Sequence, residues 1–251
     1  MSYSVSIITV VYNGSATIRD CLASVASQTY PAEHIIIDGG SIDDTLEIVR
    51  EFPHVARVVS EPDGGIYDAM NKGLIKASGD VIGILNADDF YVDNDVIATI
   101  AAAFASHNVE SVFGDLVYVR RDDTSRVVRY YNSARCTPDR FAYGWMPAHP
   151  TFFVKRACYE QYGLFKTDYR IASDFELLAR FLGKHRISYR YIPKVMIKMR
   201  AGGMSTKSWR SNVILNREIL RACSENGIRT NYCMVYSKYL TKLFQLWDRP
   251  R

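Results

Sequence analysis

Carboxylate and amide side chains gather at the ends of short apolar runs, where they could bind a metal and a phosphorylated ligand. The tetrapeptide Asn86-Ala87-Asp88-Asp89 directly follows the apolar run 81–85. Hard oxygen ligands held at a strand end suit Mg²⁺ or Mn²⁺, in particular a metal that also binds a diphosphate. The same tetrapeptide is equally compatible with the cap of a helix that begins near Asn94.

The first half of the chain alternates apolar runs with helical patterns, and these elements must position the polar residues. Strands are expected at 5–11, 34–37, 55–59 and 81–85, and helices around 18–25, 46–49, 69–77 and 95–105. This alternation predicts an α/β fold with a parallel sheet covered by helices on both faces. Such sheets bind ligands beyond the carboxyl ends of their strands.

Polar turns follow all four expected strands. They are Tyr12-Asn13-Gly14, Asp38-Gly39-Gly40-Ser41, Glu61-Pro62-Asp63-Gly64-Gly65 and Asn86-Ala87-Asp88-Asp89. Because parallel strands end on one edge, four such turns in register predict one shared site. Taken alone, the turn at Asp38 would be an ordinary connection to a helix with a capping serine.

The second half changes character. Strands are expected at 111–118 and 126–130 around a hairpin turn at 121–123, and an irregular loop at 145–150 leads into a strand at 151–154. A helix over 173–182, extended segments at 189–192 and 195–199, a glycine-containing break at 202–205 and helices over 209–224 and 232–247 complete the expected elements.

The composition is that of an ordinary globular protein. The 251 residues are 48% hydrophobic and 23% charged, which excludes a disordered or collagen-like chain. No apolar run reaches the ~20 residues of a membrane span, and the start of the chain reads as a buried strand rather than a signal peptide. Five scattered cysteines without a C-x-x-C pair indicate reduced thiols in a cytosolic protein.

The positive charge is concentrated at the end of the chain. Residues 207–251 hold nine Lys/Arg and three Asp/Glu, a net charge of +6, while the rest of the chain has a net charge of −2. This distribution argues against a nucleic-acid-binding core and for a basic end that contacts an anionic partner.

Several motifs in sequence order resemble the family 2 glycosyltransferases with the GT-A fold. They are Val5–Asn13, Ile37–Thr45, Ser60–Gly73 and Gly79-Asp80 followed by Leu85–Asp89. The resemblance covers about residues 3–205. The stretch Glu61–Gly73 is similar to that of members that assemble bacterial O-antigen, capsule or colanic-acid-type repeat units.

The resemblance implies a set of donor-binding positions. Asp38 matches the Asp that hydrogen-bonds the nucleotide base, and the turn Tyr12–Asn13 lies against the nucleoside. Asp68 and Asn71 belong to the segment that flanks the nucleotide and the donor sugar.

The resemblance also implies a metal site for Mn²⁺ or Mg²⁺. Asp88 matches the last Asp of the D-x-D motif, which coordinates the metal on the donor diphosphate, and Asn86-Ala87 precedes it. Asn86 replaces the first Asp of that motif with a neutral, weaker ligand, which puts strict metal dependence in question. Asp89 either orients Asp88 or caps the next helix, and the cap is the preferred interpretation.

Asp174 matches the family's general base, which takes the proton of the acceptor hydroxyl in an inverting reaction. Ser173 stands where the family usually has Glu, so one carboxylate remains of the pair. Glu176, two residues further on, points to another side of the helix and is expected to be structural or solvated. The alternative for Asp174 is an ordinary helix N-cap.

Three further residues are candidates on the diphosphate and acceptor sides. Arg200, before the glycine-containing break, is placed to grip the diphosphate, with a solvated arginine as the alternative. His149 and Trp145 are candidate acceptor contacts, although a buried loop histidine and a tryptophan that plugs the loop explain them as well. Asp115 is compatible with two interpretations, an acceptor contact or a residue that ends a strand.

The resemblance divides the chain into a GT-A domain at 1–206, with a nucleotide half (about 1–115) and an acceptor half (about 116–206), and a basic helical extension at 207–251. The pattern at 232–247 is an amphipathic helix with lysines that lies on an anionic bilayer or packs on its own protein or a dimer mate. Acceptors in such pathways are polyprenyl-diphosphate-linked saccharides, so the expected location is cytoplasmic, peripheral at the inner face of the cell membrane. The oligomeric state stays open.

The leading hypothesis is an inverting, metal-assisted glycosyltransferase (hexosyl or N-acetylhexosaminyl) that uses a nucleotide sugar, with UDP as the expected nucleotide. A nucleotidyltransferase is disfavoured because residues 12–16 contain no basic residue. A degenerate module that only binds sugar nucleotide stays open because Asn86 and Ser173 are both losses of acidic residues.

Overall fold

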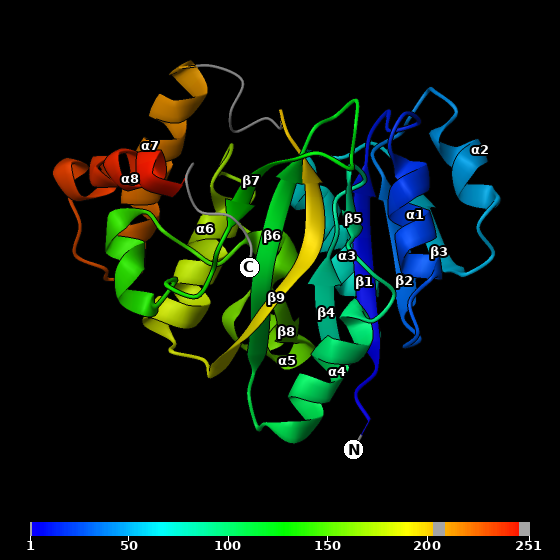
Figure 1. The fold of residues 1–251 in the computed structure, drawn as a ribbon, viewed down its shortest axis with the longest axis horizontal. Coiled ribbons are helices and arrows are strands. Elements are labelled where there is room, and N and C mark those ends of the chain that lie inside the picture. The colour runs from blue at the N-terminus through cyan, green and yellow to red at the C-terminus, as the bar shows by residue number, and fades with distance from the viewer. Residues whose placement is uncertain (1, 203–208, 246–251) are drawn as a thin grey trace.

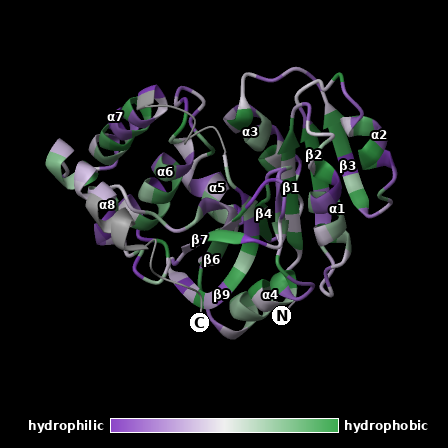
Figure 2. Ribbon diagram, turned by 45° about the horizontal axis from the view of Figure 1, so that its top comes forward, coloured by the Kyte–Doolittle hydropathy of each residue, from purple (hydrophilic) through white to green (hydrophobic). Residues whose placement is uncertain are grey.

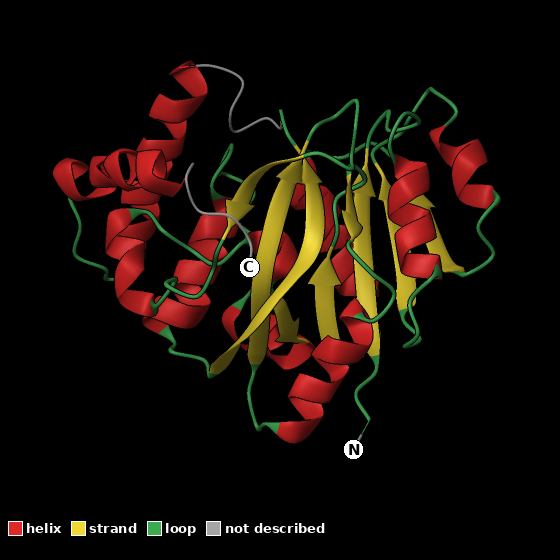
Figure 3. Ribbon diagram, in the orientation of Figure 1, coloured by secondary structure: helices red, strands yellow, loops and turns green. Residues whose placement is uncertain are grey.

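A nine-stranded sheet organises the described part of the chain, residues 2–202 and 209–245 of a computed structural model (Figures 1 and 3). The strands are β1 (Val5–Val11), β2 (Glu33–Asp38), β3 (Val55–Ser60), β4 (Val81–Ile84), β5 (Asp89–Tyr91), β6 (Ser111–Val119), β7 (Val127–Tyr131), β8 (Phe153–Lys155) and β9 (Tyr189–Arg200). The α-helices are α1 (Ile18–Ala26), α2 (Thr45–Arg50), α3 (Ile66–Lys76), α4 (Val96–Ser106), α5 (Arg156–Tyr162), α6 (Ser173–Leu178), α7 (Trp209–Glu225) and α8 (Tyr232–Gln245). Two 3₁₀ helices, η1 (Pro138–Tyr143) and η2 (His149–Thr151), and the π-helical η3 (Ala179–Lys184) complete the elements.

Four parallel strands form the first half of the sheet, in the order β3-β2-β1-β4. All seven residues of β1 are buried, as expected for a strand with helices on both faces. The backbone N–H of Gly39 donates to the carbonyl of Val11, and that of Leu85 to Ile8, so the carboxyl ends of these strands share one edge. The predicted gathering of the strand-end turns is therefore confirmed.

The second half of the sheet introduces antiparallel strands. β8 is antiparallel to β4 and to the start of β6, and β7 is antiparallel to the end of β6. β9 runs parallel to β6 and antiparallel to β5. The sheet is mixed, and the predicted α/β architecture is confirmed.

Helices cover both faces of the sheet (Figure 1). Because successive side chains of a strand point to opposite faces, Ile8 and Val10 of β1 pack in the cluster that includes α3, α5, α6 and α7, whereas Ile7 and Val11 pack toward α1 and its neighbours. Figure 2 shows hydrophobic residues along β1, β2 and β4 and a mixture of both kinds around α1 and α7, as expected for helices with one buried face.

Some sequence-based element predictions are wrong. Asp89 does not cap a helix, because it begins the short strand β5, is fully buried, and leaves the N-cap of α4 to Asp95. The two extended segments at 189–192 and 195–199 form one continuous strand, β9. The helix expected over 173–182 becomes π-helical after Leu178. Positions 203–205 of the glycine-containing break and Leu246 and Trp247 lie outside the described residues.

The two C-terminal helices pack on α6 and η1. Ile219, Ala222 and Cys223 of α7 and Val235 of α8 belong to the main hydrophobic core, which joins them to α6 and η1. Lys238, expected between the apolar positions of α8, is 2% exposed, with its Nζ 5.4 Å from the centre of the Tyr239 ring. No described helix is both long and apolar enough to cross a membrane.

Candidate active site

Two turns at the ends of β1 and β2 hold each other by hydrogen bonds. The backbone N–H of Asn13 donates to Ser41 Oγ at 2.7 Å, and the backbone N–H of Ile42 donates to Asn13 Oδ1 at 2.9 Å. Asn13 adopts a left-handed backbone with φ of 49°, which asparagine tolerates better than most residues. The Asn13 side chain therefore holds the turns after β1 and β2 together. The ring of the neighbouring Tyr12 is 65% exposed and open to a ligand.

Asp38, expected to bind the nucleotide base, is fully buried and bonded within its own turn. Its carboxylate accepts hydrogen bonds from Ser41 N at 3.0 Å and from the hydroxyls of Ser41 and Ser60, the latter at 2.6 Å. With both oxygens occupied, Asp38 in this structure holds the strand ends together.

Asp63 is the carboxylate that lies beside the exposed tyrosine, and the sequence interpretation missed it. A β-carbon on Gly39 would lie 2.5 Å from Asp63 Oδ2 and 3.5 Å from the Tyr12 ring. Asp63 Oδ1 accepts the Gly65 N–H at 2.8 Å, whereas Oδ2 makes no hydrogen bond with a described residue. The absence of a side chain at Gly39 was the signal in the sequence, because it leaves room for this carboxylate.

The two predicted residues of α3 differ in their surroundings. Asp68 is partly exposed, accepts the Gly64 N–H at 2.9 Å and lies 3.5 Å from Lys72 Nζ. The Asn71 amide is fully occupied, because it donates to the Phe165 carbonyl at 2.8 Å and accepts the Phe165 N–H at 2.9 Å. Asn71 thus fastens α3 to the acceptor half.

The residues at the end of β4 offer oxygen atoms without partners. Asn86 Nδ2 donates to Asp89 Oδ2 at 3.3 Å, while Asn86 Oδ1 and Asp89 Oδ1 are buried and accept no hydrogen bond. Asp88 is partly exposed, and its carboxylate has no partner among the described residues. Orphaned hard oxygens beside a free carboxylate fit a divalent cation. Ala87 is buried and offers its backbone only.

A metal bound there would need further ligands from the donor or from water, because the described residues contain no group of three His, Cys, Asp or Glu side chains that could hold a metal. Burial raises the pKa of Asp89 well above its usual range, and the neighbouring Asp88 adds to this shift.

Arg200 supports this segment. Its Nη1 donates to the Asp88 carbonyl at 2.7 Å and its Nη2 pairs with the Asp20 carboxylate. The side chain is 6% exposed and its guanidinium carbon lies 5.0 Å from the centre of the Phe90 ring. With these contacts in place, Arg200 positions the backbone of Asp88 and has no guanidinium edge open to a diphosphate.

Asp174 lies on the first turn of α6 and is not its N-cap, which is Ala172. Burial raises the pKa of Asp174 to about 6, against hydrogen bonds from the Phe175 N–H and the Tyr67 hydroxyl that lower it. The Tyr67 hydroxyl also donates to the Ile171 carbonyl. A helix of the nucleotide half therefore contacts the candidate base.

Glu176 is structural, as predicted. Its carboxylate lies 3.0 Å from Arg180 Nη2 and 3.2 Å from Lys166 Nζ, with 1% of the side chain exposed. Ser173, where the family usually has Glu, is buried and donates to the Lys166 carbonyl at 2.7 Å. Asp174 is therefore the partly exposed carboxylate of this helix.

A row of paired residues crosses the sheet between the two halves of the site. Asp89 of β5 pairs with Met199 of β9, Met199 with Tyr118 of β6, and Tyr118 with Arg129 of β7. Adjacent strands lie about 4.8 Å apart, so Asp89 is roughly 10 Å from Tyr118. Burial raises the pKa of Tyr118, and the charges of both Asp89 and Asp174 raise it further. Asp89 and Asp174 therefore both lie close enough to Tyr118 for their charges to act on its hydroxyl.

The acceptor-side candidates lie near this row. His149 is 8% exposed, packs edge-on against the Phe165 ring at 5.7 Å, and has its pKa lowered to about 4 by burial. It is a neutral imidazole. The half-buried Trp145 ring lies 6.5 Å from that of Tyr131. Asp115 accepts hydrogen bonds from the hydroxyls of Tyr130 and Tyr191 and from the Ser133 N–H, which makes it structural.

Comparison with known proteins identifies relatives along most of the chain. Residues 6–163 match the model of the family described as Glycosyl transferase family 2. A PGL/p-HBAD biosynthesis glycosyltransferase of Mycobacterium tuberculosis is 29% identical over 223 residues, which cover 86% of this chain and 82% of the relative. The glycosyltransferase AglE of Haloferax volcanii is 37% identical over 91 residues, or 34% of this chain and 30% of the relative.

Solved structures share the fold. S. aureus TarS in complex with UDP-GlcNAc superposes with a TM-score of 0.71 at 18% identity, covering 90% of this chain and 68% of that chain. The mannosyltransferase PcManGT from Pyrobaculum calidifontis in complex with GDP-Man and Mn²⁺ gives a TM-score of 0.66 at 23% identity, covering 88% and 65%. The sheet order and these matches together show that the chain belongs to glycosyl transferase family 2, as a nucleotide-sugar-dependent glycosyltransferase with a GT-A fold.

Proposed function

We propose that the chain is an inverting hexosyl- or N-acetylhexosaminyltransferase that uses a UDP-linked sugar and a lipid-linked saccharide acceptor in bacterial surface polysaccharide synthesis. One observation carries the proposal. The Asp174 carboxylate on the first turn of α6 is partly exposed and has a pKa of about 6. Tyr118 lies close enough both to Asp174 and to Asp89, which follows the oxygen-rich end of β4, for the two charges to raise its pKa.

The reaction is a single displacement. The acceptor hydroxyl attacks C1 of the donor sugar while Asp174 takes its proton. The bond between C1 and the diphosphate oxygen breaks, and its electron pair leaves with the nucleoside diphosphate. Because the pKa of Asp174 is about 6, the carboxylate is ionised at neutral pH yet more basic than an exposed aspartate.

The donor binds at the ends of β1 to β4. Tyr12 stacks on the base, and Asp63 Oδ2 accepts its ring N–H, a role that the sequence interpretation gave to Asp38. Asn13 and Asp38 hold the two turns in place, and Asp68 lies at the start of α3 beside the donor. Relatives in solved structures bind UDP-GlcNAc or GDP-Man, so both nucleotides belong in a donor screen.

Asp88 and Asn86 Oδ1 would hold Mn²⁺ or Mg²⁺, supported by the buried oxygens without partners. Bound there, the metal neutralises the charge that develops on the departing diphosphate. Arg200 keeps the Asp88 backbone in position for this contact.

The proposal also includes the site of the acceptor and a contact of the chain with a membrane. Trp145 and His149 lie in the loop that we assign to the acceptor. Tyr232 and Tyr236 on α8 are 59% and 45% exposed and belong to the basic end of the chain, which supports contact with an anionic bilayer surface. The mycobacterial relative reported above is named for PGL/p-HBAD biosynthesis, and its name does not mention O-antigen or capsule.

Hydrolysis of UDP-, GDP- and dTDP-sugars in the presence of Mn²⁺ tests the proposal. We expect slow release of nucleoside diphosphate from one donor by the native chain. Asp174→Asn should retain nucleotide binding and lose turnover, while Asp123→Asn, which changes an Asp of the β6–β7 hairpin, should behave as the native chain. Nucleotide-sugar binding without turnover by the native chain would instead indicate a binding module.

A further inference from the structure

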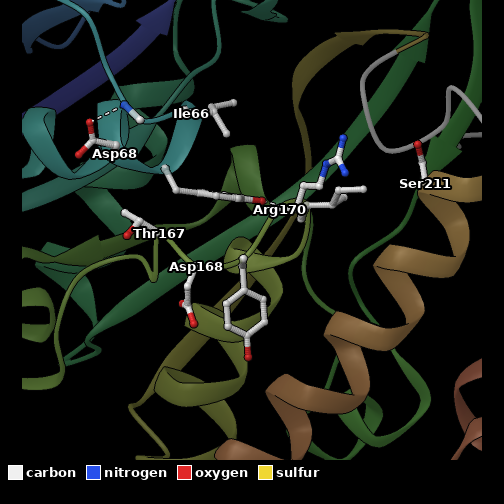
Figure 4. A pocket seen from close by; sticks show the side chains of 11 residues that line it. Ile66, Asp68, Thr167, Asp168, Arg170 and Ser211 are labelled. Atoms are coloured by element: carbon white, nitrogen blue, oxygen red, sulfur yellow. Dashed lines mark hydrogen bonds between the residues drawn. The ribbon is translucent and has the colours of Figure 1, made fainter.

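A cavity of about 570 Å³ opens beside the candidate base (Figure 4). Residues 64–68, at the start of α3, form one wall, residues 167–171 form another, and Ser211 of α7 completes the lining. Tyr67 belongs to this lining, and its hydroxyl lies close enough to the carboxylate of Asp174 to lower the pKa of that group. The cavity is within the size range of pockets for small ligands. Asp174 does not itself line the cavity, which is connected to it through the lining residue Tyr67.

The two acidic residues of the cavity have partners that they share with other carboxylates. Asp68 accepts the Gly64 N–H and lies 3.5 Å from Lys72 Nζ, which also pairs with Glu61, and Asp168 pairs with Arg221, which also pairs with Glu225. Arg170 is exposed, and its guanidinium makes no hydrogen bond or ion pair with a described residue. Its charge is therefore unmatched within the described lining.

The backbone that carries Arg170 is fixed. The Glu218 carboxylate of α7 accepts the N–H groups of Arg170, Ile171 and Ala172 at 2.7, 2.9 and 2.9 Å. Figure 4 shows the Arg170 side chain extending toward the side of the cavity where Ser211 lies. Across the cavity, α3 begins after Gly65 without a side-chain cap, so its first N–H groups add positive potential.

We propose that this cavity binds the acceptor and that Arg170 binds an anionic group of it, a phosphate or a carboxylate. The inference rests on the proposed function, because Asp174 activates a hydroxyl that must belong to a molecule beside it. The guanidinium fork suits either anion in a bidentate contact. Of the residues that we assign to the donor, Tyr12, Asp63 and Asp88 do not line the cavity, whereas Asp68 does, so the two ligands would meet at the start of α3.

Ligand-observed NMR titrations on the full chain, with UDP and Mn²⁺ present to fill the donor site, test the proposal. The probes are N-acetylglucosamine 1-phosphate, methyl glucuronide and the neutral methyl N-acetylglucosaminide. We expect the phosphate or the carboxylate probe to bind the native chain about tenfold more tightly than the neutral probe, because a charge-assisted contact of this kind contributes about that factor. Which charged probe binds more tightly identifies the anion.

Arg170→Ala should reduce the charged probe to the affinity of the neutral one, and Arg170→Lys should retain part of the preference. Arg229→Ala, which removes an exposed arginine outside the cavity, should leave the preference unchanged. The dissociation constant of UDP should stay the same in all variants. Equal binding of charged and neutral probes by the native chain, no binding of the charged probes, or weaker UDP binding in Arg170→Ala would overturn the proposal. Failure of the proposed function would show separately, as absent donor hydrolysis.

Discussion

Tyr67 and Asp174 come from different halves of the chain, yet the Tyr67 hydroxyl lies close enough to the Asp174 carboxylate to lower its pKa. Tyr67 is on α3, which begins just after the turn that carries Asp63, and Asp174 is on α6. The same hydroxyl donates to the Ile171 carbonyl. A change in the donor-side helix is therefore felt directly by the group that activates the acceptor.

The pH dependence of catalysis follows from this contact. The base must be ionised, so with a pKa of about 6 for Asp174, kcat/KM should be level above that pH and fall about tenfold per unit below it. Tyr67→Phe removes a hydrogen bond that lowers this pKa, so the acid limb should move to higher pH. Initial rates from pH 5 to 9 give the pH profiles of the native chain and of Tyr67→Phe. If the acid limb of the variant's profile does not move to higher pH, the assignment of Asp174 as the base is contradicted.

Removal of the base should separate binding from chemistry. We expect Asp174→Asn to reduce kcat by a factor on the order of 10² to 10⁴, typical of a lost general base. The affinity for UDP should stay within about twofold, a difference well below the 1.4 kcal/mol of a tenfold change. Stopped assays for product and calorimetry for UDP provide the two measurements, and a large loss of UDP affinity would place Asp174 on the donor side.

Asn86→Asp should strengthen metal binding. A second carboxylate beside Asp88 raises the charge of the ligand set, and we expect Mn²⁺ to bind about tenfold more tightly in the presence of UDP. Without metal, the added repulsion should lower the melting temperature. Electron paramagnetic resonance of Mn²⁺ measures the affinity. Asn94→Asp adds the same charge at an exposed position and should change neither quantity.

Asp63 and Asp38 should respond differently to alanine. Asp63→Ala should weaken UDP binding about tenfold through loss of a charge-assisted hydrogen bond, with little change in stability. Asp38→Ala leaves the hydroxyls of Ser41 and Ser60 without their acceptor and should cost about 1–3 kcal/mol of unfolding free energy. Urea unfolding and UDP titration of both variants decide this, and the reverse pattern would restore Asp38 as the base-binding residue.

Two Glu–Arg pairs with the same spacing should differ strongly in their effect on stability. Glu176→Ala leaves the buried Arg180 charge without its partner and should destabilise the protein by about 3–5 kcal/mol. Glu160→Ala breaks the exposed pair with Arg156 and should cost about 0.5 kcal/mol or less. Urea unfolding of the two variants compares them directly.

The fold was predictable wherever periodicity was strong. The runs at 5–11 and 111–118 match β1 and β6 closely, because a buried strand leaves an unbroken apolar pattern. The strand β5 was missed because it has three residues and pairs only with β9, more than one hundred residues away. A local pattern does not contain that pairing, so Asp89 resembled a helix cap.

The sequence predicted where the candidate site lies, but it did not predict many of the contacts that its side chains make. The strand-end rule located the edge, and the family resemblance singled out Asp174. The sequence could not show that Asn71 is occupied by the backbone of Phe165, or Arg200 by Asp20 and the Asp88 carbonyl. Asp63 faces Tyr12 only because its loop folds back over Gly39.

Glu218 holds the turn at residues 170–172 from a helix that lies beyond the segment matched by the family model. The proposed acceptor cavity is thus built partly by the tail of the chain, while the turns of the proposed nucleotide edge lie within the first ninety residues and are supported by Arg200. A chimera that exchanges only the last forty or so residues between relatives should therefore inherit its nucleotide preference from one parent and a reshaped acceptor pocket from the other. If the proposal holds, the tail is an inheritable determinant of what receives the sugar.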